Sequence, residues 1–192
     1  RGGADEWAVR GGFYRLNYDY QGKYLFETSG RYDGTSRFPK SSRFGFFPSF
    51  SMGWRVSEEA FFEPVKSIVN NLKLRYSYGA LGNQEVGTYA YISSMSTGQV
   101  SYLVDGQRLN ATYNPSPVAN SLTWEKITTS NFGLDFSLLQ NKLSVESDYY
   151  IRNTMGMLSV GQTLPDVFGA AEPRENAADL RTKGFDFALT WR

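Results

Sequence analysis

The sequence contains no cysteine and no histidine. Without cysteine, the chain has no disulfide framework and no thiolate metal site. Without histidine, it lacks the commonest general base and the commonest zinc ligand. No phosphate-binding loop, dinucleotide fingerprint or EF-hand spacing replaces them. The sequence therefore predicts no enzyme activity, no bound metal and no cofactor.

An excess of charge of one sign is also missing. Lys and Arg together number 20 and Asp and Glu 19, so the formal net charge is +1. A nucleic-acid-binding protein needs a basic surface to neutralise phosphates, so we expect no nucleic acid partner.

Long apolar runs are absent as well. The longest uninterrupted one is Tyr89–Ile92, whereas a transmembrane helix needs about 20 mostly apolar residues. No N-terminal stretch resembles a signal peptide. The chain starts Arg1-Gly2-Gly3 without an initiator Met, so we expect it to be a processed or cut piece.

Aromatic residues, in contrast, are abundant. The chain has 13 Tyr, 14 Phe and 4 Trp, yet its mean hydropathy is −0.43. Alternation of apolar and polar residues explains this combination, because it gives a strand one apolar and one polar face. Tyr14 and Leu16, for example, alternate with Arg15 and Asn17. Seven segments show the pattern: residues 8–20, 23–33, 46–56, 71–79, 121–138, 143–152 and 182–192.

The predicted connections are short at one end of the strands and long at the other. Those after the first and fifth strands, residues 21–22 and 139–142, are short. Those after the second, fourth and sixth, residues 34–45, 81–120 and 153–181, are long. The intermediate connection, residues 57–70, predicts a helical turn on which Phe61, Val65 and Ile68 share a face. Because alternate connections of an up-and-down sheet lie at one end, this layout is typical of outer-membrane β-barrels.

A soluble, secreted β-sandwich that binds carbohydrate is the alternative, because its strands alternate in the same way. Three features favour the barrel: the strict sidedness of the loops, Tyr and Trp on the apolar face near strand ends, and strand length. Membrane strands need roughly 9–11 residues, whereas soluble strands usually have about five or six. Since single-chain bacterial barrels need an even number of at least about eight strands, residues 1–192 are predicted to form part of a larger barrel.

An ordered set of motifs gives a family resemblance over nearly the whole chain. The motifs are Gly30–Phe38 (GRYDGTSRF), Gly45–Arg55 (GFFPSFSMGWR), Leu72–Gly79 (LKLRYSYG), Gly82–Gln84 (GNQ), Leu122–Lys126 (LTWEK), Asp148–Arg152 (DYYIR) and Asn176–Leu180 (NAADL). In this order and spacing they resemble the C-terminal half of the barrel in SusC/RagA-type TonB-dependent transporters of Bacteroidota.

The resemblance implies a barrel of about 22 strands in the outer membrane of a Gram-negative bacterium. It also implies an N-terminal plug, a SusD-like lipoprotein lid, and import of oligosaccharides or peptides with energy relayed by TonB. No plug and no TonB box is found in residues 1–192, so we expect this chain to supply barrel wall, polar lining and extracellular loops.

Charged residues on the polar faces of the strands are the candidate lumen-lining residues. They are Arg15, Asp19, Glu27, Arg31, Asp33, Arg55, Lys73, Arg75, Glu146, Asp148 and Arg152. A glycosidase-type carboxylate pair is the catalytic alternative. Cross-strand ion pairs are the better interpretation, because acidic and basic residues share these faces.

Four tyrosines in the longest predicted loop are candidate contacts for substrate or lid: Tyr89, Tyr91, Tyr102 and Tyr113. Aromatic faces beside the amides of Asn83 and Asn114 suit sugar stacking or contact with another protein. The simpler alternative, that these rings pack the loop onto itself, is favoured.

Overall fold

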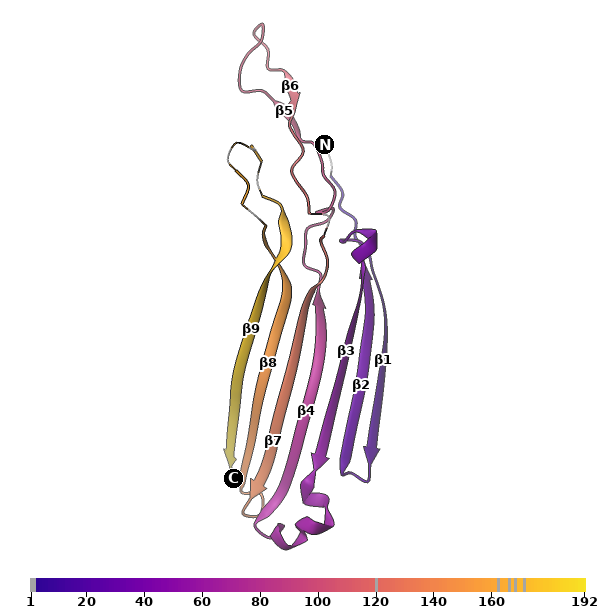
Figure 1. Ribbon diagram of the computed structural model, residues 1–192, viewed down its shortest axis with the longest axis vertical. Coiled ribbons are helices and arrows are strands. Elements are labelled where there is room, and N and C mark those ends of the chain that lie inside the picture. The colour runs from indigo at the N-terminus through magenta and orange to yellow at the C-terminus, as the bar shows by residue number, and fades with distance from the viewer. Residues whose placement is uncertain (1–2, 120, 162, 166, 168, 171) are drawn as a thin grey trace.

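Long antiparallel strands dominate the computed structural model, which describes residues 3–119, 121–161, 163–165, 167, 169–170 and 172–192. Seven of them form one sheet in the order β1-β2-β3-β4-β7-β8-β9, so every strand pairs with its neighbour along this series (Figure 1). Their bounds are β1 Val9–Tyr20, β2 Tyr24–Thr35, β3 Phe44–Arg55, β4 Val69–Asn83, β7 Glu125–Leu138, β8 Leu143–Val160 and β9 Arg174–Trp191. The predicted all-β, up-and-down arrangement is confirmed.

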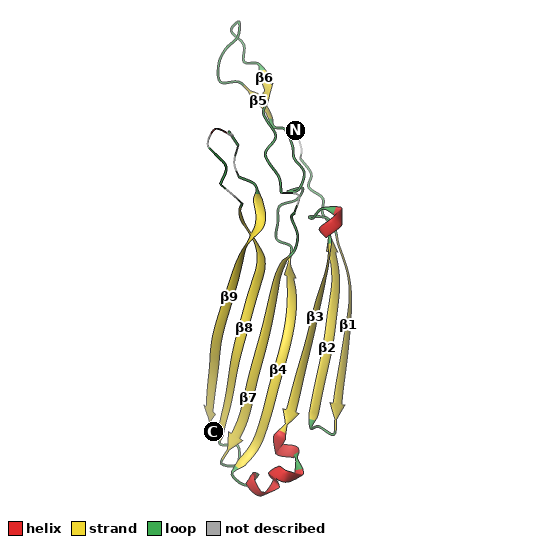
Figure 2. Cartoon of the chain, viewed as in Figure 1, coloured by secondary structure: helices red, strands yellow, loops and turns green. Residues whose placement is uncertain are grey.

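The two ends of the sheet differ as predicted. Short turns join β1 to β2 and β7 to β8 at one end, and the long loops gather at the other (Figure 1). The first turn places Gln21 and Gly22 at φ values of 54° and 66°, which suits a tight hairpin turn. The connection from β3 to β4 contains the 3-10 helices η2 (Val56–Glu58) and η3 (Ala60–Val65), and η1 (Lys40–Ser42) lies at the opposite end (Figure 2).

Strand bounds differ from the prediction mainly after Arg152. Strand β8 continues to Val160 and β9 begins at Arg174, so the predicted loop 153–181 contracts to the segment between these residues. Register shifts between Thr154 and Leu158 explain the error, because each bulge breaks the period-2 pattern. In the predicted loop 81–120, a further hairpin forms from β5 (Thr97–Gln99) and β6 (Asn110–Thr112) and extends furthest from the sheet (Figure 1).

Strand register determines which side chains share a face, because directly paired residues point to the same side. Pairings that run from β4 to β9 join four aromatic residues into one row: Tyr76, Phe132, Tyr149 and Phe185. The adjacent row, on the other face, contains Arg75, Gly133, Asp148 and Asp186. The sheet therefore has one apolar and one polar face.

The apolar face is open rather than packed against a second layer. Tyr18 is 62% exposed, Phe132 54% and Phe185 64%. Among the described residues, the only other sheet is the two-stranded β5–β6 hairpin. An apolar surface of this extent marks a region that contacts lipid or another molecule.

Candidate functional site

The charged residues predicted from alternation all lie on the polar face of the seven-stranded sheet. Register places them in neighbouring rows of paired positions. They are Arg15 and Asp19 on β1; Glu27, Arg31 and Asp33 on β2; Arg55 on β3; Lys73 and Arg75 on β4; and Glu146, Asp148 and Arg152 on β8.

Arg75 is the centre of the most extensive ionic cluster on this face. Its Nε and one terminal nitrogen donate to the two carboxylate oxygens of Asp135 at 2.8 and 2.7 Å. The same terminal nitrogen donates to Asp148 at 2.9 Å, and the Asn131 amide donates to the other Asp148 oxygen at 2.7 Å. The three charged side chains are 21–30% exposed. This bidentate contact of Arg75 with Asp135, partly shielded from water, and the further contact with Asp148 link β4, β7 and β8.

Gly133 provides the space that this cluster needs. A Cβ atom at this position would lie 2.6 Å from the Arg75 Cζ atom and 2.7 Å from an Asp148 oxygen. Register places Gly133 between the two residues, paired with Arg75 on one side and Asp148 on the other. The arginine crosses β7 over the glycine to reach Asp148, so any side chain there would displace it.

The other ion pairs of this face are more exposed. Arg15 donates to Glu27 at 2.8 Å, and Arg31 donates to Asp33 at 3.0 Å. The side chains of these two arginines are 63% and 59% exposed. Among the residues that the structure describes, no ion pair involves the following members of the predicted set: Asp19, Arg55, Lys73, Glu146 and Arg152.

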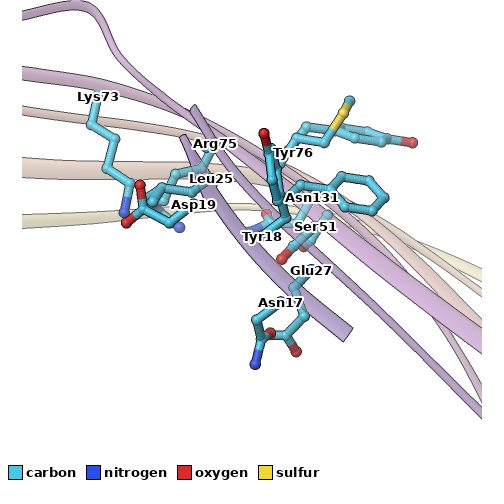
Figure 3. Close-up of a pocket in the computed structure, with 14 residues that line it drawn as sticks. Asn17, Tyr18, Asp19, Leu25, Glu27, Ser51, Lys73, Arg75, Tyr76 and Asn131 are labelled. Atoms are coloured by element: carbon cyan, nitrogen blue, oxygen red, sulfur yellow. The ribbon is translucent and has the colours of Figure 1, made fainter. Parts of the chain in front are cut away.

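A recess of about 520 Å³ opens where strands β1 to β4 and β7 lie together. Figure 3 shows Asp19, Lys73 and Arg75 among its lining residues, with Leu25 beside them. Gly53 leaves room for Lys73, whose Cε atom would lie 3.3 Å from a Cβ at that position. Carboxylates, cations, hydroxyls and amides line the recess together with the aromatic and apolar residues Tyr18, Phe26, Met52 and Tyr76. The polar groups suit hydrogen bonding to a polar molecule.

The four candidate tyrosines are not brought together. Tyr91 packs against the buried residues Phe38, Ala119 and Leu122, and the Tyr89 hydroxyl accepts a hydrogen bond from the Glu6 backbone at 3.4 Å. Tyr102 and Tyr113 lie instead in and beside the projecting β5–β6 hairpin and are 63% and 50% exposed.

The loop core, defined as Phe38, Ala119, Leu122 and Trp124, was not predicted. Trp124 donates to the Arg43 carbonyl at 3.1 Å, and its ring lies 5.4 Å from that of Phe38. It joins the loop between β2 and β3 to the segment before β7. The sequence signal was present in the motifs at 30–38 and 122–126, whose loop residues prove to contact each other.

Asn176 makes a second link that the alternation did not indicate. Its amide accepts from the Thr123 backbone and donates to the Thr123 carbonyl, both at 3.0 Å, and also bonds the Gly156 carbonyl. One side chain of β9 therefore holds β8 and the segment before β7. This motif residue at 176 acts as a clamp between loops.

Comparison with known proteins is consistent with this geometry. The family model described as "TonB dependent receptor-like, beta-barrel" matches residues 1–192. The chain belongs to the TonB-dependent receptor β-barrel family.

Several members of this family are similar over nearly the whole chain. The TonB-dependent receptor SusC of Bacteroides thetaiotaomicron is 34% identical over 179 residues, which cover 92% of this chain and 18% of that protein. TonB-dependent receptor P3 of Formosa agariphila is 33% identical, covering 94% of this chain and 18% of its own. The chain therefore spans less than a fifth of the length of these relatives.

Solved structures of the RagAB peptide importer have the same arrangement of strands. The "open-open" state is 29% identical with a TM-score of 0.80 and is matched over 95% of this chain and 19% of the solved chain. The resemblance to the SusC/RagA-type family is confirmed.

Membership of a TonB-dependent receptor barrel assigns the two faces of the sheet. The strands are part of an outer-membrane barrel wall, so one face meets hydrocarbon. Arg or Lys facing lipid at mid-membrane costs about 2–4 kcal/mol, so the aromatic face is the outward one. The soluble β-sandwich alternative is wrong, because the seven long strands form one continuous sheet that matches the barrel wall of solved TonB-dependent transporters.

The described residues contain neither a metal-ligand cluster nor a membrane-spanning helix. Within the described ranges, no group of three or more acidic residues is arranged to hold a metal ion. No helix in the described part of the chain is long and apolar enough to span a membrane.

Glu59, between η2 and η3, joins the short-turn end of the barrel to its outward face. The carboxylate accepts from the Tyr24 hydroxyl at 2.7 Å and from the Trp54 indole at 3.1 Å, and Lys23 donates to it at 3.3 Å. The Tyr24 hydrogen bond, followed by that of Trp54, holds the pKa of Glu59 below its ordinary value. Nothing in the sequence around Glu59 indicates this role, because the three donors come from other segments.

We expect the turn around Glu59 to loosen in acid. Because folding lowers the pKa of Glu59, the ionised carboxylate stabilises the turn at pH values above its ordinary pKa of 4.5. That stabilisation is lost as the pH falls through the lowered pKa of the folded state. Hydrogen exchange of residues 59–68, corrected for intrinsic pH dependence, should therefore increase as the pH falls from 4.5 through that lowered pKa. Glu59→Gln keeps a carbonyl acceptor, so its exchange should change little with pH, and an equal change in both proteins would contradict the assignment.

Proposed function

We propose that this chain is barrel wall of an outer-membrane importer that takes up oligosaccharides or peptides. Energy arrives through TonB, and a SusD-like lipoprotein closes the extracellular side as a lid. The role of the chain is transport rather than catalysis. The observation that carries the proposal is the separation of the faces: every member of the predicted charged set lies opposite the aromatic rows.

The charged face has two kinds of residue in this proposal. The Arg75 cluster makes its hydrogen bonds within the sheet and stabilises the wall. Asp19 and Lys73 line the recess, and no ion pair joins them to other described side chains. One Asp19 oxygen accepts a hydrogen bond from the Gly22 backbone at 2.7 Å, which leaves the other oxygen for a ligand. Asp19 and Lys73 face the aqueous passage and form transient hydrogen bonds with a polar molecule that passes.

The extracellular loops support the lid. The loop core and the Asn176 clamp hold the bases of the loops against each other. The projecting hairpin presents Tyr102 and Tyr113, which combine an apolar ring with a hydrogen-bonding hydroxyl and suit a protein contact. Tyr89 and Tyr91 lie in the loop body, where Tyr91 stabilises the loop core.

Uptake by the complete transporter tests the proposal. Cells that lack the gene should fail to grow when one class of nutrient, oligosaccharide or peptide, is their sole nutrient source. Complementation with the double variant Asp19→Ala, Lys73→Ala should restore only part of the uptake rate at unchanged protein level. Lys142→Ala, in the exposed turn between β7 and β8, is the matched control and should restore it fully. Full uptake of both nutrient classes without the gene would overturn the proposal.

A further inference from the structure

The connection between β3 and β4 has an apolar surface that the transport function does not explain. Three of its side chains are largely exposed at the short-turn end: Phe61 at 66%, Val65 at 45% and Ile68 at 64%. Leu139 of the neighbouring turn, 54% exposed, adds a fourth, and its N–H donates to the Ile68 carbonyl. Phe62 alone in η3 is buried.

Contacts at its start place this connection on the outward side of the barrel. Ser57 is buried and donates to Asn71, which pairs with Ser137 on the polar face. Two residues later, Glu59 accepts hydrogen bonds from Tyr24 and Trp54, which pair with each other on the outward face. The chain therefore passes under the edge of the sheet from the lumen side to the lipid side.

Contacts at its end return it to the same outward face. A bulge between Val69 and Asn71 pairs Val69 with Leu138, and Leu138 pairs with Leu143 in the outward row that ends at Trp191. Residues 60–68 thus begin and end on the lipid side. The segment therefore lies next to the lipid-facing surface of the strands, beyond its aromatic edge.

We propose that residues 60–68 form an interfacial foot that inserts Phe61, Val65 and Ile68 into the periplasmic leaflet of the outer membrane. Its ligand is phospholipid, at the boundary between headgroups and acyl chains. Glu58 and Lys66, which form an ion pair of 3.6 Å at the same end of the barrel, suit the polar headgroup level. The foot rests on the assignment of the faces and is independent of the transported molecule.

Spin labels measure the depth of the foot directly. Residues 1–192 contain no cysteine. In a complete transporter that has no other cysteine, a single Cys at position 61, 65 or 68 is therefore the only site that the spin label modifies. The labelled protein is reconstituted in vesicles of phosphatidylethanolamine and phosphatidylglycerol, and collision of the label with oxygen and with a water-soluble nickel complex is compared. Leu16→Cys on the outward face and Asp105→Cys in the exposed loop, measured in vesicles without a lid protein, calibrate lipid and water.

If the foot inserts into the leaflet, the label at all three positions will collide mainly with oxygen rather than with the nickel complex. It will lie about 5–10 Å below the headgroup phosphates. Nickel access equal to that at position 105 would overturn it, since the segment would then lie in water. Shielding from both reagents would also overturn it, since a protein would then cover the segment. Uptake by cells that lack the gene separates the two proposals: if both nutrient classes are still taken up while the labels report the predicted depth, the transport role fails and the foot stands.

Discussion

Arginine in place of Tyr76 will destabilise the barrel by about 2–4 kcal/mol, the cost of a cation facing hydrocarbon at mid-membrane. Arginine in place of the adjacent Ser77 will cost far less. Both residues lie near the middle of β4, at the same depth, and point to opposite faces. The measurement is the free energy of unfolding of the complete transporter in phospholipid vesicles, obtained from denaturant titration.

Loss of the ring itself needs a separate control. The Tyr76 ring lies 4.7 Å from that of Phe132 and 5.7 Å from that of Phe50, so any smaller side chain loses contacts. Tyr76→Leu measures that loss without a charge. Equal destabilisation by Tyr76→Arg and Ser77→Arg would show that the two faces of β4 meet the same medium.

Arg75→Met will destabilise the barrel by about 2 kcal/mol. Removal of one partner from a fully buried ion pair costs about 3–5 kcal/mol, because the other charge stays behind without compensation. The Arg75 cluster is 21–30% exposed, so water reduces that penalty. Arg15→Met is the matched control: its ion pair with Glu27 is largely exposed and is worth less than about 1 kcal/mol.

A compensating variant identifies the cause of the loss. Asp135→Asn with Asp148→Asn removes the two charges that Arg75→Met would leave unmatched. The triple variant should therefore be more stable than Arg75→Met alone. If Arg75→Met costs no more than Arg15→Met, the cluster does not hold the wall together.

The faces of the strands could be predicted from sequence because alternation depends only on local order. Tyr14 and Arg15 must point to opposite sides of a strand, whichever strand pairs with it. The same reasoning failed beyond Arg152, where bulges near Met157 shift the alternation by one residue. A bulge has no alternating signature, so β8 and β9 were predicted too short.

Contacts between distant segments were beyond the sequence reasoning. The distance from Trp124 to Phe38 depends on how two loops fold back over the sheet. Glu59 was assigned only to a helical turn, whereas its partners Tyr24 and Trp54 come from β2 and β3. The tyrosines of the longest loop were predicted as one group, but the hairpin separates Tyr102 from Tyr91.

Thiol accessibility along β3 tests most directly which face of the sheet meets water. Four consecutive residues there alternate between the faces: Ser49 and Ser51 on the polar face, Phe50 and Met52 on the outward one. Single Cys variants of the complete transporter in intact membranes are treated with a small charged maleimide. Modification of positions 49 and 51, with positions 50 and 52 protected, is the predicted result. Modification of 50 and 52 with protection of 49 and 51, or equal reaction at all four, would contradict the account.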